Sequence, residues 1–140
     1  MKCVELKKWI EDQFKELLMV NTNIIMDIHF QYMNKINIKP LSVNEAWKGR
    51  RFKTDKYKTY ENSVLWLLPK IAIPEPPFAI YFKFGLSSTL SDWDNPVKPF
   101  QDILSKKYKF NDKLIRRAII ETEIVEKGKE YIEFAIQTVK

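Results

Sequence analysis

Hydrophobic and polar residues follow two different periods along this chain, and these periods predict both helices and strands. Near the amino terminus, apolar residues recur every three or four positions, at Leu6, Trp9, Ile10, Phe14, Leu17 and Leu18. This spacing places them on one face of a helix over residues 4–20. The polar run Asn21–Asn23 ends that helix, and Ile24–Phe30 alternates imperfectly, as either a strand or further helix would.

The middle of the chain predicts one strand and one helix. Ile36–Leu41 has the composition of a strand that runs into Pro40. Thr54 is a good helix cap, because its side-chain oxygen can accept a backbone N–H of the first turn. The helix that it begins carries apolar residues at helical spacing, namely Tyr57, Tyr60, Val64, Leu67 and Leu68.

The last half of the chain predicts strand, helix and hairpin in turn. Strict alternation over Phe78–Phe84 is typical of a half-buried strand. A helix follows over Asn95–Lys106, with Asp94 or Asn95 as its cap and Pro96 in its first turn. Finally, Leu114–Val125 and Tyr131–Val139 form a hairpin about a turn at residues 126–129. We therefore predict an α+β fold: a mixed sheet of about four strands flanked by helices, with an extra amino-terminal helix.

Length and composition agree with a folded protein of this kind. The chain has 140 residues, of which 45% are hydrophobic and 30% charged, enough for one packed core. No apolar run approaches the roughly 18–20 residues that span a bilayer. The first eight residues carry too many charges for a signal-peptide core. We expect a cytoplasmic protein without a membrane partner.

The small number of cysteine and histidine residues limits which metal ions the chain could bind. The chain contains one cysteine, Cys3, and one histidine, His29. One cysteine excludes an internal disulfide and a thiolate zinc cage. His29 lies in an apolar stretch, where a structural role is the more common one. A catalytic metal would therefore be bound mainly by oxygen, which favours Mg²⁺, with Mn²⁺ as the alternative.

Positive charge is concentrated in one part of the chain. Residues 35–70 contain nine Lys or Arg and three acids, so this segment carries the whole net charge of +6. Such a concentration is typical of proteins that bind a phosphate backbone. Four aromatic residues are interleaved with these charges, namely Trp47, Phe52, Tyr57 and Tyr60, and they fit either stacking on unpaired bases or packing of a helix onto the core.

Three aspartates and a lysine stand out against this basic background. In an extended segment, Asp92 and Asp94 would point to the same side and could offer two oxygen ligands to one cation, with Asp112 as a third. Ordinary roles compete with this one, since Asp94 can cap a helix, Asp112 can form a turn, and Lys98 can pair with Asp102. Asp92 has no such local role. Glycosyltransferases also use a D-x-D pair, but we see no nucleotide-binding βαβ pattern here.

The motif Asp92-Trp93-Asp94-Asn95-x-x-Lys98, then a helix, then Asn111-Asp112, resembles the RusA family of Holliday-junction resolvases, small endonucleases of phages and prophages. The segment Lys39–Asn44 and the basic loop after it are also similar to that family. The resemblance covers residues 35–140, and residues 1–34 form an amino-terminal extension beyond it. Ser91 departs from the family, in which a basic residue often precedes the first aspartate.

The resemblance implies a homodimeric endodeoxyribonuclease that nicks paired strands of a four-way junction in DNA recombination and repair. Asp92, Asp94 and Asp112 would be catalytic residues that hold one or two Mg²⁺ ions, and Lys98 would stabilise charge on the phosphate. The residues expected to contact branched DNA without reading its sequence are Asn44, Lys48, Arg50, Arg51, Lys53, Lys56 and Lys58.

Three other interpretations stay open. The first is a nucleic-acid-binding protein without catalysis, in which the acids are structural. The second is a nuclease of the PD-(D/E)xK class, with Glu121, Glu123 and Lys127, although no Pro-Asp precedes them at a workable spacing. The third is a structural phage protein that assembles through its amino-terminal helix.

Overall fold

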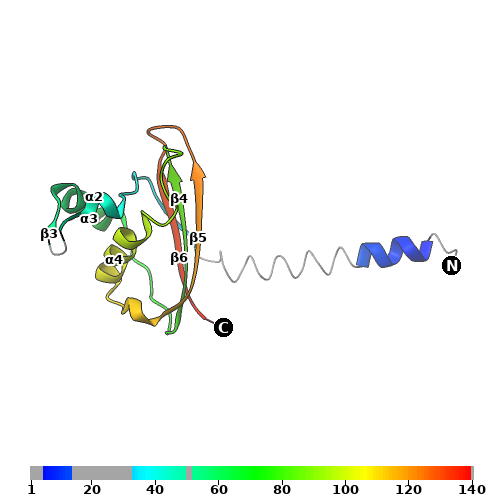
Figure 1. The fold of residues 1–140 in the computed structure, drawn as a ribbon. Helices are drawn as coiled ribbons and strands as arrows, with labels where there is room; N and C mark the ends of the chain where they lie inside the picture. The colour runs from blue at the N-terminus through cyan, green and yellow to red at the C-terminus, as the bar shows by residue number, and fades with distance from the viewer. Residues whose placement is uncertain (1–4, 14–32, 50–51, 140) are drawn as a thin grey trace. The chain divides into compact units, whose positions relative to one another are not determined.

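The structure, a computed structural model, describes residues 5–13, 33–49 and 52–139. The chain divides into two compact units, Met1–Gln31 and Tyr32–Lys140. In the first unit, residues 5–13 are helical, which confirms the predicted helix over these positions (Figure 1). The rest of that helix and Ile24–Phe30 lie outside the described residues. No helix in the described part of the chain combines the length and the apolar composition of a membrane span.

The second unit is built on a four-stranded mixed sheet, which confirms the predicted α+β class (Figure 1). Its strands lie in the order β1-β6-β4-β5. Strand β4 is parallel to β5 and antiparallel to β6, and β1 is antiparallel to β6. The four strands are β1 (Asn34–Ile36), β4 (Phe78–Leu86), β5 (Ile115–Ile124) and β6 (Tyr131–Thr138).

The predicted hairpin of the last two strands is wrong. Strands β5 and β6 follow each other in the chain, but β4 lies between them, with Tyr81 opposite both Ile119 and Ala135. The reason is the burial of β4, in which seven of nine residues are buried. Such an apolar strand is best placed at the centre of a sheet, where both of its edges are hydrogen-bonded.

The parallel pairing creates a strand–helix–strand crossover from β4 through α4 (Val97–Tyr108) to β5. We did not predict this βαβ unit. The connection between β4 and α4, residues 87–96, contains no glycine, so it differs from the glycine-rich loop of nucleotide-binding units. In open sheets with such crossovers, ligands bind beyond the carboxyl ends of the strands. Asp92 and Asp94 lie in the connection that follows the carboxyl end of β4.

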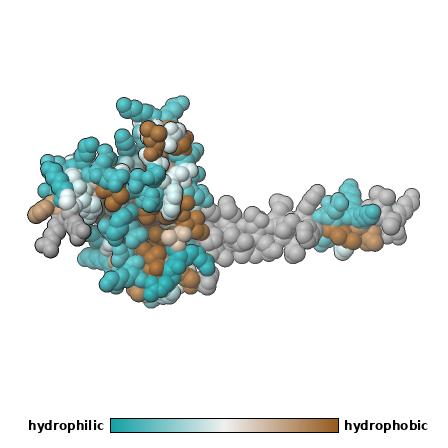
Figure 2. Space-filling model, in the orientation of Figure 1, coloured by the Kyte–Doolittle hydropathy of each residue, from teal (hydrophilic) through white to brown (hydrophobic). Residues whose placement is uncertain are grey.

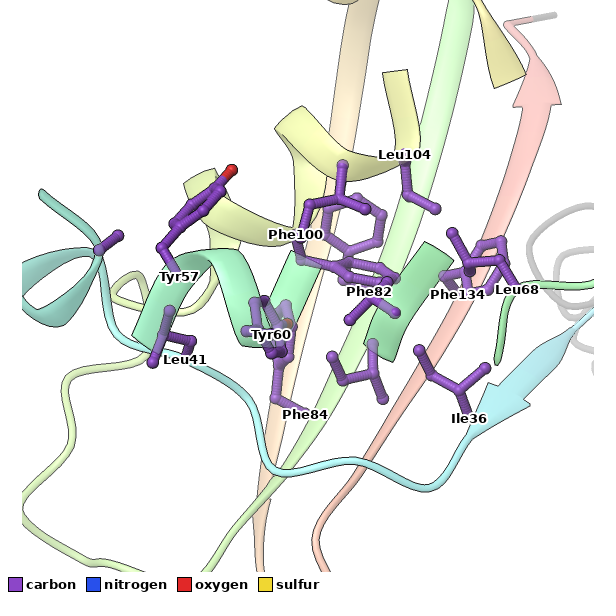
Figure 3. Packing of buried hydrophobic residues seen from close by; sticks show 14 of the residues in the cluster. Ile36, Leu41, Tyr57, Tyr60, Leu68, Phe82, Phe84, Phe100, Leu104 and Phe134 are labelled. Atoms are coloured by element: carbon purple, nitrogen blue, oxygen red, sulfur yellow. The ribbon is translucent and has the colours of Figure 1, made fainter. Parts of the chain in front are cut away.

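Two helices cover one face of the sheet and form the core with it (Figures 1 and 3). Helix α3 (Asp55–Leu67) begins as predicted, because the Thr54 side chain accepts the backbone N–H of Tyr57. Phe100 of α4 is fully buried, and its ring centroid lies 5.1 Å from that of Phe82 and 5.6 Å from that of Phe134. These contacts between edges and faces of aromatic rings fix α4 against β4 and β6.

Smaller elements lie next to α3. A short helix, α2 (Val43–Ala46), begins at Ser42 and is followed by a two-stranded ribbon of β2 (Trp47–Lys48) and β3 (Phe52–Lys53). Gly49 in the turn of this ribbon has φ +65, a conformation that glycine adopts without strain. The ribbon belongs to the segment in which the positive charge is concentrated.

Two predicted boundaries are corrected. Strand β1 covers Asn34–Ile36 instead of Ile36–Leu41, since it pairs with β6, which begins at Tyr131, and Ile36 already lies opposite Ile132. Helix α4 begins at Val97, and Pro96 occupies its cap position without any side-chain cap. A residue before proline is disfavoured in helical conformation, which explains why Asn95 stays outside the helix.

Candidate acidic site at the start of helix α4

The connection from β4 to α4 presents Asp92 and Asp94 on a structured turn. The Asn95 N–H donates to the Asp92 carbonyl at 3.3 Å, and the Val97 N–H donates to the Asp94 carbonyl at 3.1 Å. The Asn95 carbonyl in turn accepts the N–H of Val43 at 2.8 Å. This last bond ties the start of α2, next to Asn44, to the acidic turn. The backbone around the two aspartates is therefore fixed from both sides.

The side chains of Asp92 and Asp94 are exposed, and within the described ranges neither carboxylate accepts a hydrogen bond or forms an ion pair. The prediction that Asp94 caps the helix is wrong, because only its backbone carbonyl contacts the first turn. Both carboxylates thus remain available to a ligand. Exposed carboxylates this close in sequence repel each other, and a cation would relieve that repulsion.

Lys98 joins two parts of the motif that are distant in sequence. Its Nζ lies 2.7 Å from Oδ1 of Asp102, one turn further along α4, and 3.5 Å from Oδ2 of Asp112. Gln101 Nε2 donates to the same Asp112 oxygen at 3.3 Å. Asp112 begins the short 3₁₀ helix η1 (Asp112–Leu114), which Asn111 caps through its side chain. Asn111 therefore forms the local turn, while the Asp112 carboxylate points to α4.

Asp102 and Gln101 were not predicted as site residues. Asp102 was expected to pair with Lys98, and it does. Because Lys98 also contacts Asp112, Asp102 belongs to the site as a neighbour of Lys98. The hydrogen bond to Asp102 and the charges of Asp102 and Asp112 raise the pKa of Lys98 above its usual value, against the opposing effect of desolvation. Lys98 is therefore an ammonium ion at neutral pH, held between two carboxylates.

The donors of this region suit a hard cation, but their arrangement is not a ready metal centre. In the described part of the chain, no three His, Cys, Asp or Glu side chains lie close enough together to hold a metal ion. The structure thus brings Lys98, Asp102 and Asp112 together, and it does not gather Asp92, Asp94 and Asp112 into one group. Carboxylate oxygens without sulfur or imidazole are the ligands that Mg²⁺ prefers.

Apart from Lys53, the predicted DNA-binding residues fall into three groups. Lys48, Lys58 and Asn44 are exposed, and Asn44 lies in the first turn of α2. Lys56 pairs with Glu45 at 3.4 Å on the surface. Arg50 and Arg51 lie outside the described residues. The exposed lysines flank the ribbon and the start of α3, where they can contact phosphates without rearrangement.

Lys53, by contrast, forms a salt bridge inside the protein with Glu61. The sequence analysis did not predict a structural role for Glu61. Glu61 is 7% exposed and contacts Lys53 Nζ at 2.8 Å and Lys106 Nζ at 2.5 Å. Burial opposes its ionisation, but the hydrogen bonds and charges of the two lysines outweigh burial and lower the pKa of Glu61. Its position could have been a signal, because it lies at helical spacing between buried Tyr57 and Val64.

Most aromatic residues of the basic segment pack inward. Tyr57 and Tyr60 are buried, and Trp47 lies with its ring centroid 5.5 Å from that of Tyr57. Burial, with smaller effects of Asp102 and Glu61, raises the pKa of Tyr57 to about 12. Phe52 in the ribbon and Trp66 in the last turn of α3 are the exceptions, with 71% and 89% of their surfaces exposed. Of the four aromatic residues predicted to stack or pack, Phe52 is the one placed for stacking on a base.

The glutamates of the alternative PD-(D/E)xK interpretation have partners elsewhere on the sheet. Glu121 accepts a hydrogen bond from the Tyr81 hydroxyl at 2.9 Å. Glu123 accepts one from the Tyr131 hydroxyl and lies 3.8 Å from Lys83 Nζ. In the sheet, Glu121 and Glu123 lie beside Lys83 and Gly85 of β4. Those two positions alternate with the core residues of β4, so both glutamates lie on the sheet face opposite α3 and α4. Hydrogen-bonded pairs of this kind need no metal to explain them.

Comparison with known proteins identifies no family for this chain: no family model matches it, and neither does any curated protein sequence. The resemblance to the RusA resolvases rests on the acidic motif and on the segment around Lys39–Asn44.

Proposed function

We propose that this protein is a Mg²⁺-dependent, structure-selective DNA endonuclease that resolves four-way junctions, as the RusA family does. The main support is the contact between Lys98 and Asp112, which come from separate elements and meet at 3.5 Å. Together with Asp92 and Asp94 they are the motif residues on which the resemblance depends. A second support is that the Asp92 and Asp94 carboxylates have no structural partner within the described residues.

In this proposal Asp92, Asp94 and Asp112 would hold one or two Mg²⁺ ions. Bound Mg²⁺ would lower the pKa of a water molecule and offset negative charge at the scissile phosphate. Lys98 keeps its proton because of its two carboxylate neighbours, so it supplies a fixed positive charge to the phosphate as charge develops there. Asp102 holds the Lys98 ammonium in place from one turn away.

DNA would be held by the basic segment next to the acidic site. Lys48 and Lys58 are exposed for phosphate contacts, and Arg50 and Arg51 add charge in the same stretch of sequence. The bond between Val43 and Asn95 links this segment to the acidic turn, so bound backbone would run toward Asp92. A homodimer would match the two-fold symmetry of a four-way junction and place one site on each nicked strand.

Substitution of Asp92 tests the proposal. The Asp92→Asn variant keeps the shape of the side chain but removes a charged metal ligand. We expect cleavage of a synthetic four-way junction to fall by at least about a hundredfold while the affinity for the junction stays the same or rises. Asp55→Asn, an exposed aspartate of α3, is the matched control and should cleave normally. Full activity of Asp92→Asn would refute the metal-ligand role.

A nucleic-acid-binding protein without catalysis is the second candidate. One observation favours it, namely that the three motif aspartates do not form a metal-binding group within the described ranges. It predicts that junction DNA is bound equally well with Mg²⁺, Mn²⁺ or EDTA and is never cut. Cleavage that appears with Mg²⁺ and stops with EDTA would exclude this candidate.

A further inference from the structure

The helix at residues 5–13 carries an exposed apolar stripe. All nine residues are exposed, including the large side chains of Leu6, Trp9 and Ile10 at 45%, 55% and 52%. Figure 2 shows the result, a hydrophobic band along one side of this helix and a hydrophilic surface on the other. The three residues have the spacing i, i+3 and i+4, which is the pattern of a helix that packs against a partner.

An amphipathic helix of this kind is stabilised by a partner, because most helical stability in proteins comes from packing of the apolar face. Trp9 and Ile10 are also among the most costly side chains to leave in water. Coverage of the stripe would therefore stabilise the helix itself.

The charge of the helix narrows the choice of partner. Residues 5–13 contain two lysines and three acidic residues, so the segment is slightly negative. A helix that binds an anionic membrane surface or a phosphate backbone needs a clear excess of positive charge. Neither ligand suits this segment. Another protein helix with charges of both signs does.

The two edges of the stripe carry opposite charges. At 3.6 residues per turn, Glu5 and Asp12 border the stripe on the side of Trp9, whereas Lys7 borders it on the side of Ile10. If two copies pair in parallel, the acidic edge of each helix faces the basic edge of the other. If they pair antiparallel, the acidic edge faces itself and Lys7 faces Lys7. Charge complementarity thus favours the parallel pair.

We propose that residues 5–13 form a parallel helix pair with the same segment of a second copy of this chain. The stripe of Leu6, Trp9 and Ile10 is buried in the pair, and Lys7 of each copy faces Asp12 of the other. The pair does not depend on the nuclease activity proposed above. It gives the amino-terminal segment a role in self-association.

Disulfide crosslinking of the full-length protein tests the pair, because the chain has a single cysteine, Cys3, two residues before Glu5. A parallel pair brings the two Cys3 residues together, and mild oxidation should yield a dimer on a non-reducing gel that is absent from Cys3→Ser. An antiparallel pair would hold them far apart. Failure of wild-type protein to form this dimer would overturn the proposal.

Charge reversal separates contacts between the helices from effects within one helix. Lys7→Glu should slow crosslinking about tenfold, since it turns two attractive contacts into repulsive ones. Lys8→Glu is the matched control, because it also removes one i,i+4 pair within the helix but lies away from the stripe, and it should crosslink at nearly the wild-type rate.

The double variant Lys7→Glu, Asp12→Lys gives the sharpest result. Within one helix the second change removes a further i,i+4 pair, with Lys8, and should weaken the helix. Between two parallel helices it restores the attraction, so we expect crosslinking to recover most of the tenfold loss. A double variant that crosslinks more slowly than Lys7→Glu, or a Lys8→Glu variant as slow as Lys7→Glu, would contradict the pair.

Discussion

Helix α4 takes part in two charge clusters, one near each of its ends. The central group is a cation between two anions in one cluster and an anion between two cations in the other. Near its start, one lysine, Lys98, lies between two carboxylates, Asp102 and Asp112. Near its end, one carboxylate, Glu61, lies between two lysines, Lys53 and Lys106. The central lysine of the first cluster is 57% exposed, whereas the central carboxylate of the second is buried.

The dipole of helix α4 stabilises the lysine of one cluster but not that of the other. A lysine in the last turn, such as Lys106, is stabilised by the negative end of the helix, but a lysine in the first turn, such as Lys98, faces the positive end. Lys98 is thus placed where its charge does not favour the helix, and it is open to solvent. We interpret the Glu61 cluster as a structural contact that holds the ribbon and α3 to α4. The proposed function assigns the Lys98 cluster to the catalytic site.

The largest expected effect comes from removing the support that both clusters share. Phe100 is fully buried between Phe82, Phe84 and Phe134. Phe100→Ala should lower the free energy of unfolding by about 3–5 kcal/mol, because it leaves a cavity beneath α4. Urea denaturation measures this loss, and junction binding and cleavage should decline together. Thr59→Ala on exposed α3 surface is the control. A loss below about 1 kcal/mol would show that α4 is held elsewhere.

Lys98→Met should separate chemistry from stability. We expect the rate of junction cleavage to fall about 100–1000-fold, since a fixed positive charge near the phosphate is lost. The free energy of unfolding should change by less than about 1 kcal/mol, because both of its ion pairs are partly exposed. Lys107→Met, on the exposed last turn of the same helix, should leave cleavage intact. Equal losses in the two variants would contradict the special role of Lys98.

Glu61→Gln should show the opposite pattern. Two charged hydrogen bonds of a buried group are weakened, so we expect the free energy of unfolding to fall by about 1–2 kcal/mol. Cleavage by the folded protein should fall far less than in Lys98→Met. Glu45→Gln, which breaks the exposed pair with Lys56, serves as the control and should cost less than about 0.5 kcal/mol. If Glu61→Gln and Glu45→Gln lower the free energy of unfolding equally, the buried Glu61 contacts do not have the proposed structural role.

At acidic pH, the difference in the free energy of unfolding between Glu61→Gln and the wild type should disappear. The pKa of Glu61 is lowered on folding, so its stabilising effect is present above its unfolded pKa of about 4.5 and is lost as pH falls through the folded value. Urea midpoints measured at pH 7 and again below pH 4.5 should therefore converge between the two proteins. A difference that stays constant with pH would rule out the ionised carboxylate as its source.

Local signals in the sequence were enough for several elements. Thr54 accepts a backbone N–H as a cap should, and the alternation that begins at Phe78 marks the central strand β4. The acidic turn was also found from its motif. Each of these signals lies within a few residues of the structure that it predicts.

The features that were missed depend on contacts between distant residues. The insertion of β4 between β5 and β6 reflects which strand is most apolar, which competes with the short turn that favours a hairpin. Glu61 meets Lys106 from 45 residues away, and Gln101 meets Asp112 from 11. The local sequence around a helical residue does not show which residue, many positions later in the chain, will contact it.

Cleavage of a four-way junction tests the central claim most directly. Wild-type protein should be incubated with a synthetic junction and with a linear duplex of the same sequence, each with Mg²⁺ and with EDTA. The proposal predicts paired nicks in the junction that require Mg²⁺, with little cutting of the duplex. Equal cutting of both substrates would contradict structure selectivity, and binding without any cut in either would contradict the nuclease.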